Sequence, residues 1–415
     1  MKIELHAEEG QAARNRFRML AKPGWLPVLF ILLTMAALMP VGSSAETSSR
    51  PSPVEVVNPK PPIPVVIDQN RVLVYELHIT NFGQTALVFR RIEIFSGESE
   101  RAIATFSDAG LAKMLTVVGG KMMMGGAADS TPEVNDSVRL DPGRRAIAFM
   151  WVELPANAPA PAKLRHRLTF VIADDAKPPA PETAPTESVI DGIMVTVSQE
   201  PAPELRSPLP AGEWLAGDGP ENSSGHRRTV VALNGRTYIS QRFASDWVMA
   251  GKNGNTFHDS REKNENFWGY GQPVFAVADG EITEAVDKFP DNTPGKPLQP
   301  VTLENIAGNH VIVRIGKDQY AMYAHLKSGS VRVRLHQMVR AGEVLAQVGN
   351  SGNTTGTHLH FQLSDGNSPL GSEGVPFILS QYTFLGYGKD FEEDKHPTIP
   401  RSHELPAGDA VVRFE

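Results

Sequence analysis

The sequence predicts a mainly β protein built from two domains. Its 415 residues exceed one typical domain, since about 150 residues per domain is the usual expectation. The 36 Gly and 33 Pro indicate many turns, which favours strands over helix bundles. Short β-like runs separated by turn residues support the same conclusion. We therefore expect a β-sandwich followed by a second β-rich domain.

The first element is an export signal in residues 1–45. Trp25–Met39 is a strongly apolar run of fifteen residues, which is short for a membrane span of about twenty. Basic residues precede it, and Ser43, Ser44 and Ala45 place small residues at a cleavage position. We expect cleavage after about Ala45, an exported chain that is periplasmic or secreted, and no stable membrane span afterwards. The alternative is an N-terminal membrane anchor.

The next element is a sandwich domain in residues 54–200. Its β-like runs are bounded by turns such as Asp141-Pro142-Gly143, a spacing typical of immunoglobulin-like sandwiches. The runs are Val72–Thr80, Leu87–Phe95, Arg145–Leu154, Leu164–Ala173 and Ser188–Val197. We find no chemistry-bearing motif in this domain.

The remaining boundaries follow from composition. Residues 201–222 are rich in Pro and Gly and read as a linker. Seven of the twelve histidines lie between His226 and His360, inside a second domain that we place at residues 223–390. Residues 391–415 are expected to form a charged tail.

Composition also limits the chemistry. The chain has no cysteine, so it has no disulfides, no thiolate metal site and no cysteine nucleophile. Any metal must therefore be bound by His, Asp or Glu. The net charge of −7 gives no support to nucleic-acid binding, which usually requires a basic surface.

A His-x-His pair carries the strongest chemical signal. The segment Gly349–Leu363 (GNSGNTTGTHLHFQL) runs from a Gly-rich turn into a strand. Because side chains alternate along a strand, His358 and His360 share one face while Leu359 and Phe361 point into a core. Two imidazoles on one face suit a metal ligand beside an acid–base group. His325 in YAMYAHLK and Asp246 in QRFASDWV are further polar residues in β-like runs.

These segments together resemble the lysostaphin-type (LytM-like) zinc endopeptidases, which cut peptide cross-links in peptidoglycan. The resemblance covers about residues 226–366. It rests on four segments in the family's order, Gly269–Ile282, Gly308–Ile315, Tyr320–Val331 and Gly342–Leu363. It implies an antiparallel β fold whose groove holds Zn²⁺.

The resemblance also implies roles for particular residues. His360 and Asp246 would bind zinc, and His325 and His358 would flank a bound water as general base or as stabilisers of the tetrahedral intermediate. The family's first histidine ligand stands four residues before the aspartate, and that position here is Arg242. A guanidinium cannot ligate zinc.

Another histidine must replace that ligand, or the site is incomplete. We favour His226. Asn234-Gly235 predicts a hairpin whose register brings His226 beside Arg242, although a bulge would be needed to turn it towards Asp246. His258, in a polar loop, is a weaker candidate.

The sequence therefore predicts an exported zinc metalloendopeptidase that acts on peptidoglycan peptide. The alternative is a zinc-free, degenerate module that binds cell wall or regulates a partner hydrolase, and a cell-envelope protein is then a further partner. A scaffold role, in which the sandwich places the second domain, is compatible with either. Nucleic acid is not expected as a partner.

Overall fold

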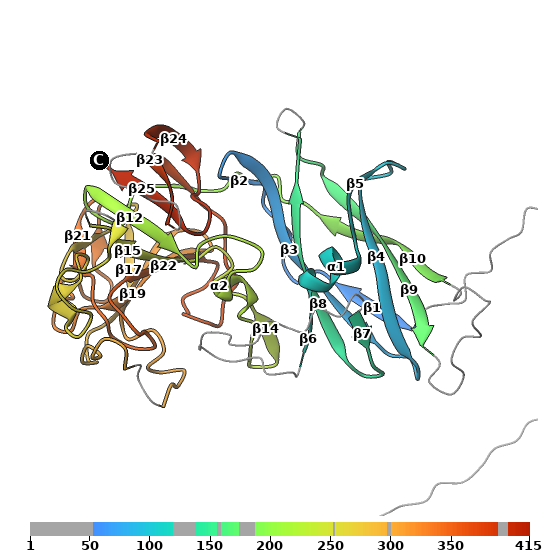
Figure 1. Ribbon diagram of the computed structural model, residues 1–415, viewed down its shortest axis with the longest axis horizontal. Helices are drawn as coiled ribbons and strands as arrows, with labels where there is room; N and C mark the ends of the chain where they lie inside the picture. The colour runs from blue at the N-terminus through green and yellow to red at the C-terminus, as the bar shows by residue number, and fades with distance from the viewer. Residues whose placement is uncertain are drawn as a thin grey trace, which may run out of the picture. The chain divides into compact units, whose positions relative to one another are not determined.

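The computed structural model describes residues 53–118, 138–155, 159–173, 187–251, 254–296, 300–388 and 397–415 (Figure 1). Strands dominate these residues, which confirms the mainly β prediction. The predicted export signal, residues 1–45, lies outside the described residues. None of the helices in the described part of the chain is long and apolar enough to cross a membrane.

Two five-stranded antiparallel sheets form the N-terminal part. The first has the order β1-β3-β8-β6 with β2 on β3, and the second has the order β10-β9-β4-β5 with β7 on β4. The strands of the first sheet are β1 (Val54–Val57), β2 (Val65–Ile67), β3 (Asn70–Asn81), β6 (Leu115–Val117) and β8 (Arg145–Glu153). Those of the second are β4 (Ala86–Ser96), β5 (Ala102–Ser107), β7 (Val138–Leu140), β9 (Lys163–Ala173) and β10 (Glu187–Thr196), and α1 (Asp108–Met114) connects β5 to β6.

Strand β3 is buried on both faces. Its odd-numbered residues, such as Leu73 and Leu77, belong to the core between the two sheets. Its even-numbered residues Val72 and Val74 belong instead to the core of the C-terminal part, as period-2 alternation requires. Glu76 lies on that second face and is fully buried. The strand thus contributes to two cores at once.

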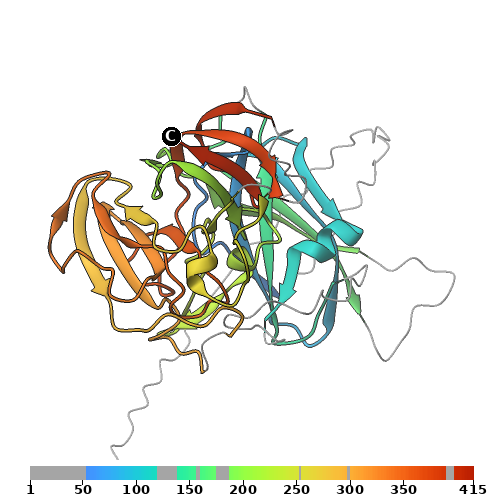
Figure 2. The same ribbon diagram turned by 60° about the vertical axis from the view of Figure 1, so that its left-hand side comes forward.

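One eleven-stranded sheet dominates the C-terminal part. Its order is β11-β23-β25-β12-β15-β22-β19-β18-β17-β20, with β24 on β23. The strands are β11 (Glu204–Leu205), β12 (Gly212–Gly217), β15 (Ser245–Met249), β17 (Gly280–Val286), β18 (Asn309–Gly316), β19 (Gln319–Leu326), β20 (Met338–Val339), β22 (Leu359–Ser364), β23 (Ile378–Tyr387), β24 (Ile399–Glu404) and β25 (Ala410–Phe414). Figure 2 shows β17, β18 and β19, coloured yellow to orange, side by side.

Smaller elements complete this part. Two two-stranded sheets pair β13 (Val231–Leu233) with β14 (Arg236–Tyr238), and β16 (Pro273–Phe275) with β21 (Val344–Gln347). The helical segments are α2 (Gly225–Arg228) and the 3₁₀ turn η2 (Asn264–Asn266).

The segments expected as linker and tail contain strands of the large sheet. Strands β11 and β12 lie within 201–222, and β24 and β25 lie within 391–415. Strand β12 pairs with both β25 and β15. The Pro- and Gly-rich composition hides these strands, although Trp214 on β12 is fully buried. The domain boundaries given above remain a prediction.

A buried histidine in the sandwich predicts acid sensitivity. His166 is fully buried; its Nδ1–H donates to the Ile193 carbonyl (3.1 Å), and Tyr75 Oη donates to its Nε2 (2.7 Å). Burial lowers the pKa of His166 from 6.5 to about 4. His166 therefore binds a proton below pH 6.5 in the unfolded chain, but only below about pH 4 in the folded chain.

We expect the His166 contribution to stability to be full above pH 6.5 and lost as the pH falls to about 4. The loss is about 3 kcal/mol, since one pKa unit is worth about 1.4 kcal/mol. Denaturant unfolding from pH 7 to pH 4 measures it, with His166→Gln as the non-titrating comparison. If the free energy of unfolding fell equally with pH in the wild type and in His166→Gln, this contribution would be ruled out.

Candidate metal centre

Adjacent strands of the large sheet bring the predicted site residues together. Strand β22 lies between β15 and β19, and His360 on β22 is the direct partner of Asp246 on β15 and of Ala324 on β19. Direct cross-strand partners have Cβ atoms about 5 Å apart, so the two polar side chains meet. His360 Nδ1 lies 2.9 Å from Asp246 Oδ1. Sheet register alone therefore creates this pair.

His325 reaches the same place through an irregular backbone. It has a φ of 61°, in the left-handed region that non-glycine residues rarely adopt. The pairing of β18 with β19 shifts register between Asn309 and Val311, opposite this position. The Nδ1–H of His325 donates to the Ser351 carbonyl at 2.8 Å, which holds the ring in place. Its ring centroid lies 4.8 Å from that of His358 and 5.8 Å from that of His360.

His226 enters from the short helix α2. The Asp218 carboxylate accepts from the Gly225 and His226 N–H groups at 2.7 and 3.0 Å, which fixes the turn. The His226 Nδ1–H donates to the Asp218 carbonyl at 2.9 Å, so Nε2 carries the lone pair. That Nε2 lies 3.5 Å from Asp246 Oδ1, and the ring packs edge-on against His360 at 4.8 Å.

The expected route of His226 to the site was wrong. The Asn234-Gly235 turn does pair Leu233 with Arg236, and both turn residues have positive φ, as a type I′ hairpin requires. The hairpin strands β13 and β14 are only three residues each, however. His226 lies before them on a helical turn, so no β-bulge is needed to direct it to Asp246.

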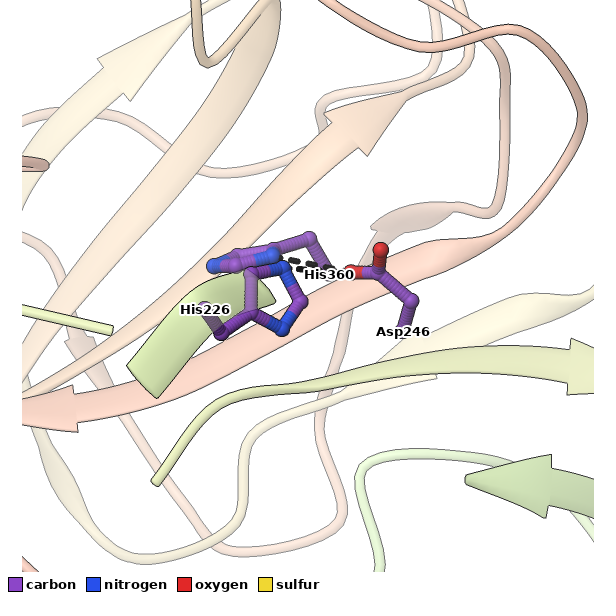
Figure 3. A group of neighbouring side chains, drawn as sticks. All are labelled: His226, Asp246 and His360. Carbon is purple, nitrogen blue, oxygen red and sulfur yellow. Dashed lines mark hydrogen bonds and ion pairs between the residues drawn. The ribbon is translucent and has the colours of Figure 1, made fainter. Parts of the chain in front are cut away.

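Three potential ligands converge at one point. The nearest ligand atoms of His226, Asp246 and His360 all lie within 4.8 Å of one another (Figure 3). Figure 3 shows both imidazoles directed at the same carboxylate. The ligand set that sequence and resemblance suggested is thus assembled in space, although metal binding itself remains a prediction.

Hydrogen bonds at the outer nitrogens fix the tautomers. The Gln362 amide donates to the Pro369 carbonyl, so its Oε1 accepts from His360 Nε2–H at 2.9 Å. Nδ1 is then the His360 nitrogen that faces Asp246; it donates its proton to the carboxylate at 2.9 Å and would ligate a cation that replaces this proton. The Nδ1–H of His358 donates to the Gly356 carbonyl at 2.9 Å. His358 Nε2 is buried, lies 3.5 Å from Asp246 Oδ1 and has no hydrogen-bond partner among the described residues.

The electrostatics favour a cation at this point. Burial raises the pKa of the Asp246 carboxyl, but its interactions with His358 and His226 outweigh burial and hold the pKa well below its usual range. Burial lowers the pKa of His360, yet the Asp246 hydrogen bond and charge raise it overall. Burial, together with the neighbouring histidines, holds the pKa of His325 well below 6.5, so that ring is neutral. An ionised carboxylate surrounded by imidazole nitrogens suits a bound cation, which would replace the proton on His360 Nδ1.

Arg242, at the position of the family's usual histidine, and His258, the weaker candidate for the third ligand, both lie elsewhere. The Arg242 guanidinium donates to the Gly374 carbonyl at 2.9 Å and to Glu373 at 2.5 Å, inside a buried ion network. His258 packs against Trp268, with 4.8 Å between the ring centroids. Neither belongs to the three-residue group.

Sequence reasoning missed two supporting residues, Asp218 and Gln362. Asp218 lies in the segment expected as a linker, where nothing distinguished it. Gln362 could have been found, because it stands two residues after His360 and therefore on the same face of β22.

Comparisons with known proteins agree with this geometry. Residues 267–371 match the model of peptidase family M23, a range that includes His325, His358 and His360. An uncharacterized metalloprotease from Haemophilus influenzae is 35% identical over 92 residues, 22% of this chain and 16% of the relative. The DD-carboxypeptidase/endopeptidase Mpg from Neisseria meningitidis is 33% identical over 113 residues, 27% of this chain and 22% of the relative.

A third relative, the murein hydrolase activator NlpD from Escherichia coli, is 31% identical over 120 residues, 28% of this chain and 27% of the relative. This chain therefore spans between 16% and 27% of the length of these curated relatives. The match of residues 267–371 to peptidase family M23 confirms the resemblance of this part of the chain to the lysostaphin-type (LytM-like) peptidases.

Proposed function

We propose that the chain is an exported zinc metalloendopeptidase that hydrolyses peptide bonds in peptidoglycan cross-links. The observation that supports this most strongly is the convergence of His226 Nε2, His360 Nδ1 and the Asp246 carboxylate within 4.8 Å of one another. Each histidine is held by a hydrogen bond at its other nitrogen, as ligating histidines usually are.

The donor set fits a catalytic zinc site. Two imidazoles and one carboxylate are three protein ligands, which leaves the fourth tetrahedral position for water or substrate. No cysteine is present to close the site. We therefore propose His226, Asp246 and His360 as the zinc ligands.

Two further histidines supply proton transfer. Zinc bound there would polarise the peptide carbonyl and lower the pKa of a water to about 7. His358 Nε2, buried without a described partner, would accept a proton from that attacking water. His325, kept neutral by its surroundings and with its Nδ1–H on the Ser351 carbonyl, would present Nε2 as a second proton acceptor.

The substrate class rests on the relatives. The Neisseria protein is named a DD-carboxypeptidase/endopeptidase, and the Escherichia protein is named a murein hydrolase activator. Peptidoglycan lies outside the cytoplasmic membrane, which agrees with the export signal expected in residues 1–45. The proposed substrate and the expected location are thus compatible.

A second candidate function is regulation of a partner hydrolase by a zinc-free module. Similarity to the hydrolase activator NlpD favours it. The complete His/Asp/His set favours the enzyme instead, because a binding surface has no physical need for three converging metal ligands.

Digestion of purified peptidoglycan distinguishes the two functions. The enzyme is expected to release new amino groups in the presence of Zn²⁺ and to stop when a chelator removes the metal. A protein that releases no amines with zinc, but stimulates a separate peptidoglycan hydrolase, would establish the activator function.

Gln362 is expected to influence metal affinity through the tautomer of His360. Gln362→Met removes the acceptor for Nε2–H, so the Nδ1 lone pair is no longer enforced. Loss of such a supporting hydrogen bond typically costs about 10–100-fold in metal affinity. Titration with Zn²⁺ against a competing chelator measures this effect. Gln362→Glu keeps an acceptor and is the matched control; equal affinities for both variants and the wild type would contradict this role.

A further inference from the structure

A buried ion network links the N-terminal sandwich to the metal-site region. Its members are Glu76, Arg227, Arg242 and Glu373, which we call the ion network. Glu76 on β3 accepts from Arg242 Nη2 at 2.7 Å and from Arg227 Nη1, and Arg242 Nη2 also donates to Glu373 at 2.5 Å. Glu76 and Arg227 are fully buried, and Arg242 is 3% exposed. The guanidinium groups of Arg227 and Arg242 therefore pair with the same buried carboxylate, that of Glu76.

Each C-terminal member lies beside a segment that carries a proposed zinc ligand. Arg227 directly follows His226. Arg242 stands four residues before Asp246. The Glu373 carbonyl accepts from the Asp365 N–H, and the Glu373 N–H donates to the Asp365 carboxylate; Asp365 comes just after β22, the strand of His360. One carboxylate of the sandwich thus connects the three ligand segments.

The His226 segment depends most on these contacts. Helix α2 has four residues, too few to be stable by itself. Arg227 Nη2 donates to the sandwich carbonyls of Tyr75 and Met150, at 3.0 and 3.2 Å. Arg228 Nη2 donates to the Lys113 carbonyl at 2.9 Å. The turn is therefore held on the sandwich by its two arginines.

Stability alone does not account for such a network. Burying charges costs several kcal/mol per ion, and a buried ion network is often no more stabilising than an apolar replacement. The two arginines offset the effect of burial on Glu76 and lower its pKa to about 2, so its charge persists at physiological pH. What charge pairing adds over apolar packing is a fixed geometry for its partners.

We infer that Glu76 is a positioning residue for the metal centre: the sandwich, through Arg227, sets the place of His226. This inference rests on the proposed function. It makes the sandwich part of the metal site rather than a separable attachment.

The test measures metal affinity in the full chain with Glu76→Gln. Co²⁺ is titrated against a competing chelator, and its visible absorption reports the ligand geometry. We expect binding at least about tenfold weaker than in the wild type, as for other residues that orient a ligand. The control is Asp191→Asn. Asp191 pairs with Arg165 and Arg167 inside the sandwich, and its loss is expected to leave Co²⁺ binding unchanged.

A paired replacement covers the risk that Glu76→Gln does not fold. Glu76→Leu with Arg227→Met removes both charges of the pair and leaves Arg242 with Glu373, so no charge is stranded. This variant is also expected to bind Co²⁺ at least about tenfold more weakly.

A double-mutant cycle separates positioning from general damage. In a His226→Ala background, the Glu76 change is expected to alter Co²⁺ affinity less than about twofold, because the ligand through which it acts is gone. An equal loss with and without His226, or wild-type affinity in the folded Glu76 variants, would overturn the inference. A wild type that binds no metal would instead refute the proposed function itself.

Discussion

Replacing His360 by alanine is expected to remove the metal and the hydrolytic activity together. His360 contributes Nδ1 at the centre of the site and is only 3% exposed. The metal is worth several kcal/mol of transition-state stabilisation, and about 4 kcal/mol corresponds to about 1,000-fold in rate. Zinc content after dialysis and the rate of amine release from peptidoglycan measure both effects.

His336→Ala is the matched control for this variant. His336 is largely exposed and pairs with Glu281, away from the converging ligands. It is expected to retain zinc and activity. If His360→Ala kept its zinc, or lost no more activity than His336→Ala, then His360 would not be a ligand.

Restoring the family's histidine at position 242 is expected to destabilise the protein rather than improve its metal site. Arg242 does not point to the ligands; it neutralises Glu76 and Glu373 inside the protein. Removing one partner of a buried ion pair typically costs about 3–5 kcal/mol, because the other charge is left uncompensated. Chemical denaturation of Arg242→His measures this loss.

Arg413→His is the comparison for an exposed pair. Arg413 contacts Glu213 at 2.7 Å with a third of its side chain exposed, so its loss is expected to cost less than about 1 kcal/mol. An Arg242→His variant with wild-type stability and tighter zinc binding would show that position 242 can serve as the ligand, contrary to the geometry described above.

The sequence allowed most of the central site to be predicted. Period-2 alternation predicted that His358 and His360 share one face, although β22 begins at Leu359 and His358 lies in an isolated bridge just before it. The resemblance supplied Asp246 and His325. Their convergence depends on strand register. The resemblance to the family implies that register, whereas the local sequence pattern does not. The left-handed backbone of His325 could not have been predicted, since nothing in YAMYAHLK favours it.

His226 was predicted for a reason that proved incomplete. The Asn-Gly turn forms, but His226 lies before its strands on a four-residue helix whose N-cap is Ser224 and whose first N–H groups donate to Asp218. Such a short helix has no periodic signal. Its position depends on Arg227 and the buried carboxylate of Glu76, which lies 151 residues earlier in the chain. Ion pairs between residues so far apart in the chain produce no recognisable pattern in the sequence around His226.

The large sheet shows a similar limit. Residues 201–222 and 391–415 appeared polar or Pro-rich, yet β12 and β25 pair with each other beside β15. Short strands of five or six residues with a few buried side chains fall below the level at which composition distinguishes them from loops.

Zinc-edge anomalous scattering from crystals of the zinc-loaded chain tests the central claim most directly. We expect one strong peak, about 2.0–2.2 Å from His226 Nε2, His360 Nδ1 and an oxygen of Asp246, which are normal zinc–ligand distances. A peak at His258 or at another group, or no peak in zinc-soaked crystals, would contradict the assignment of these three residues as the metal centre.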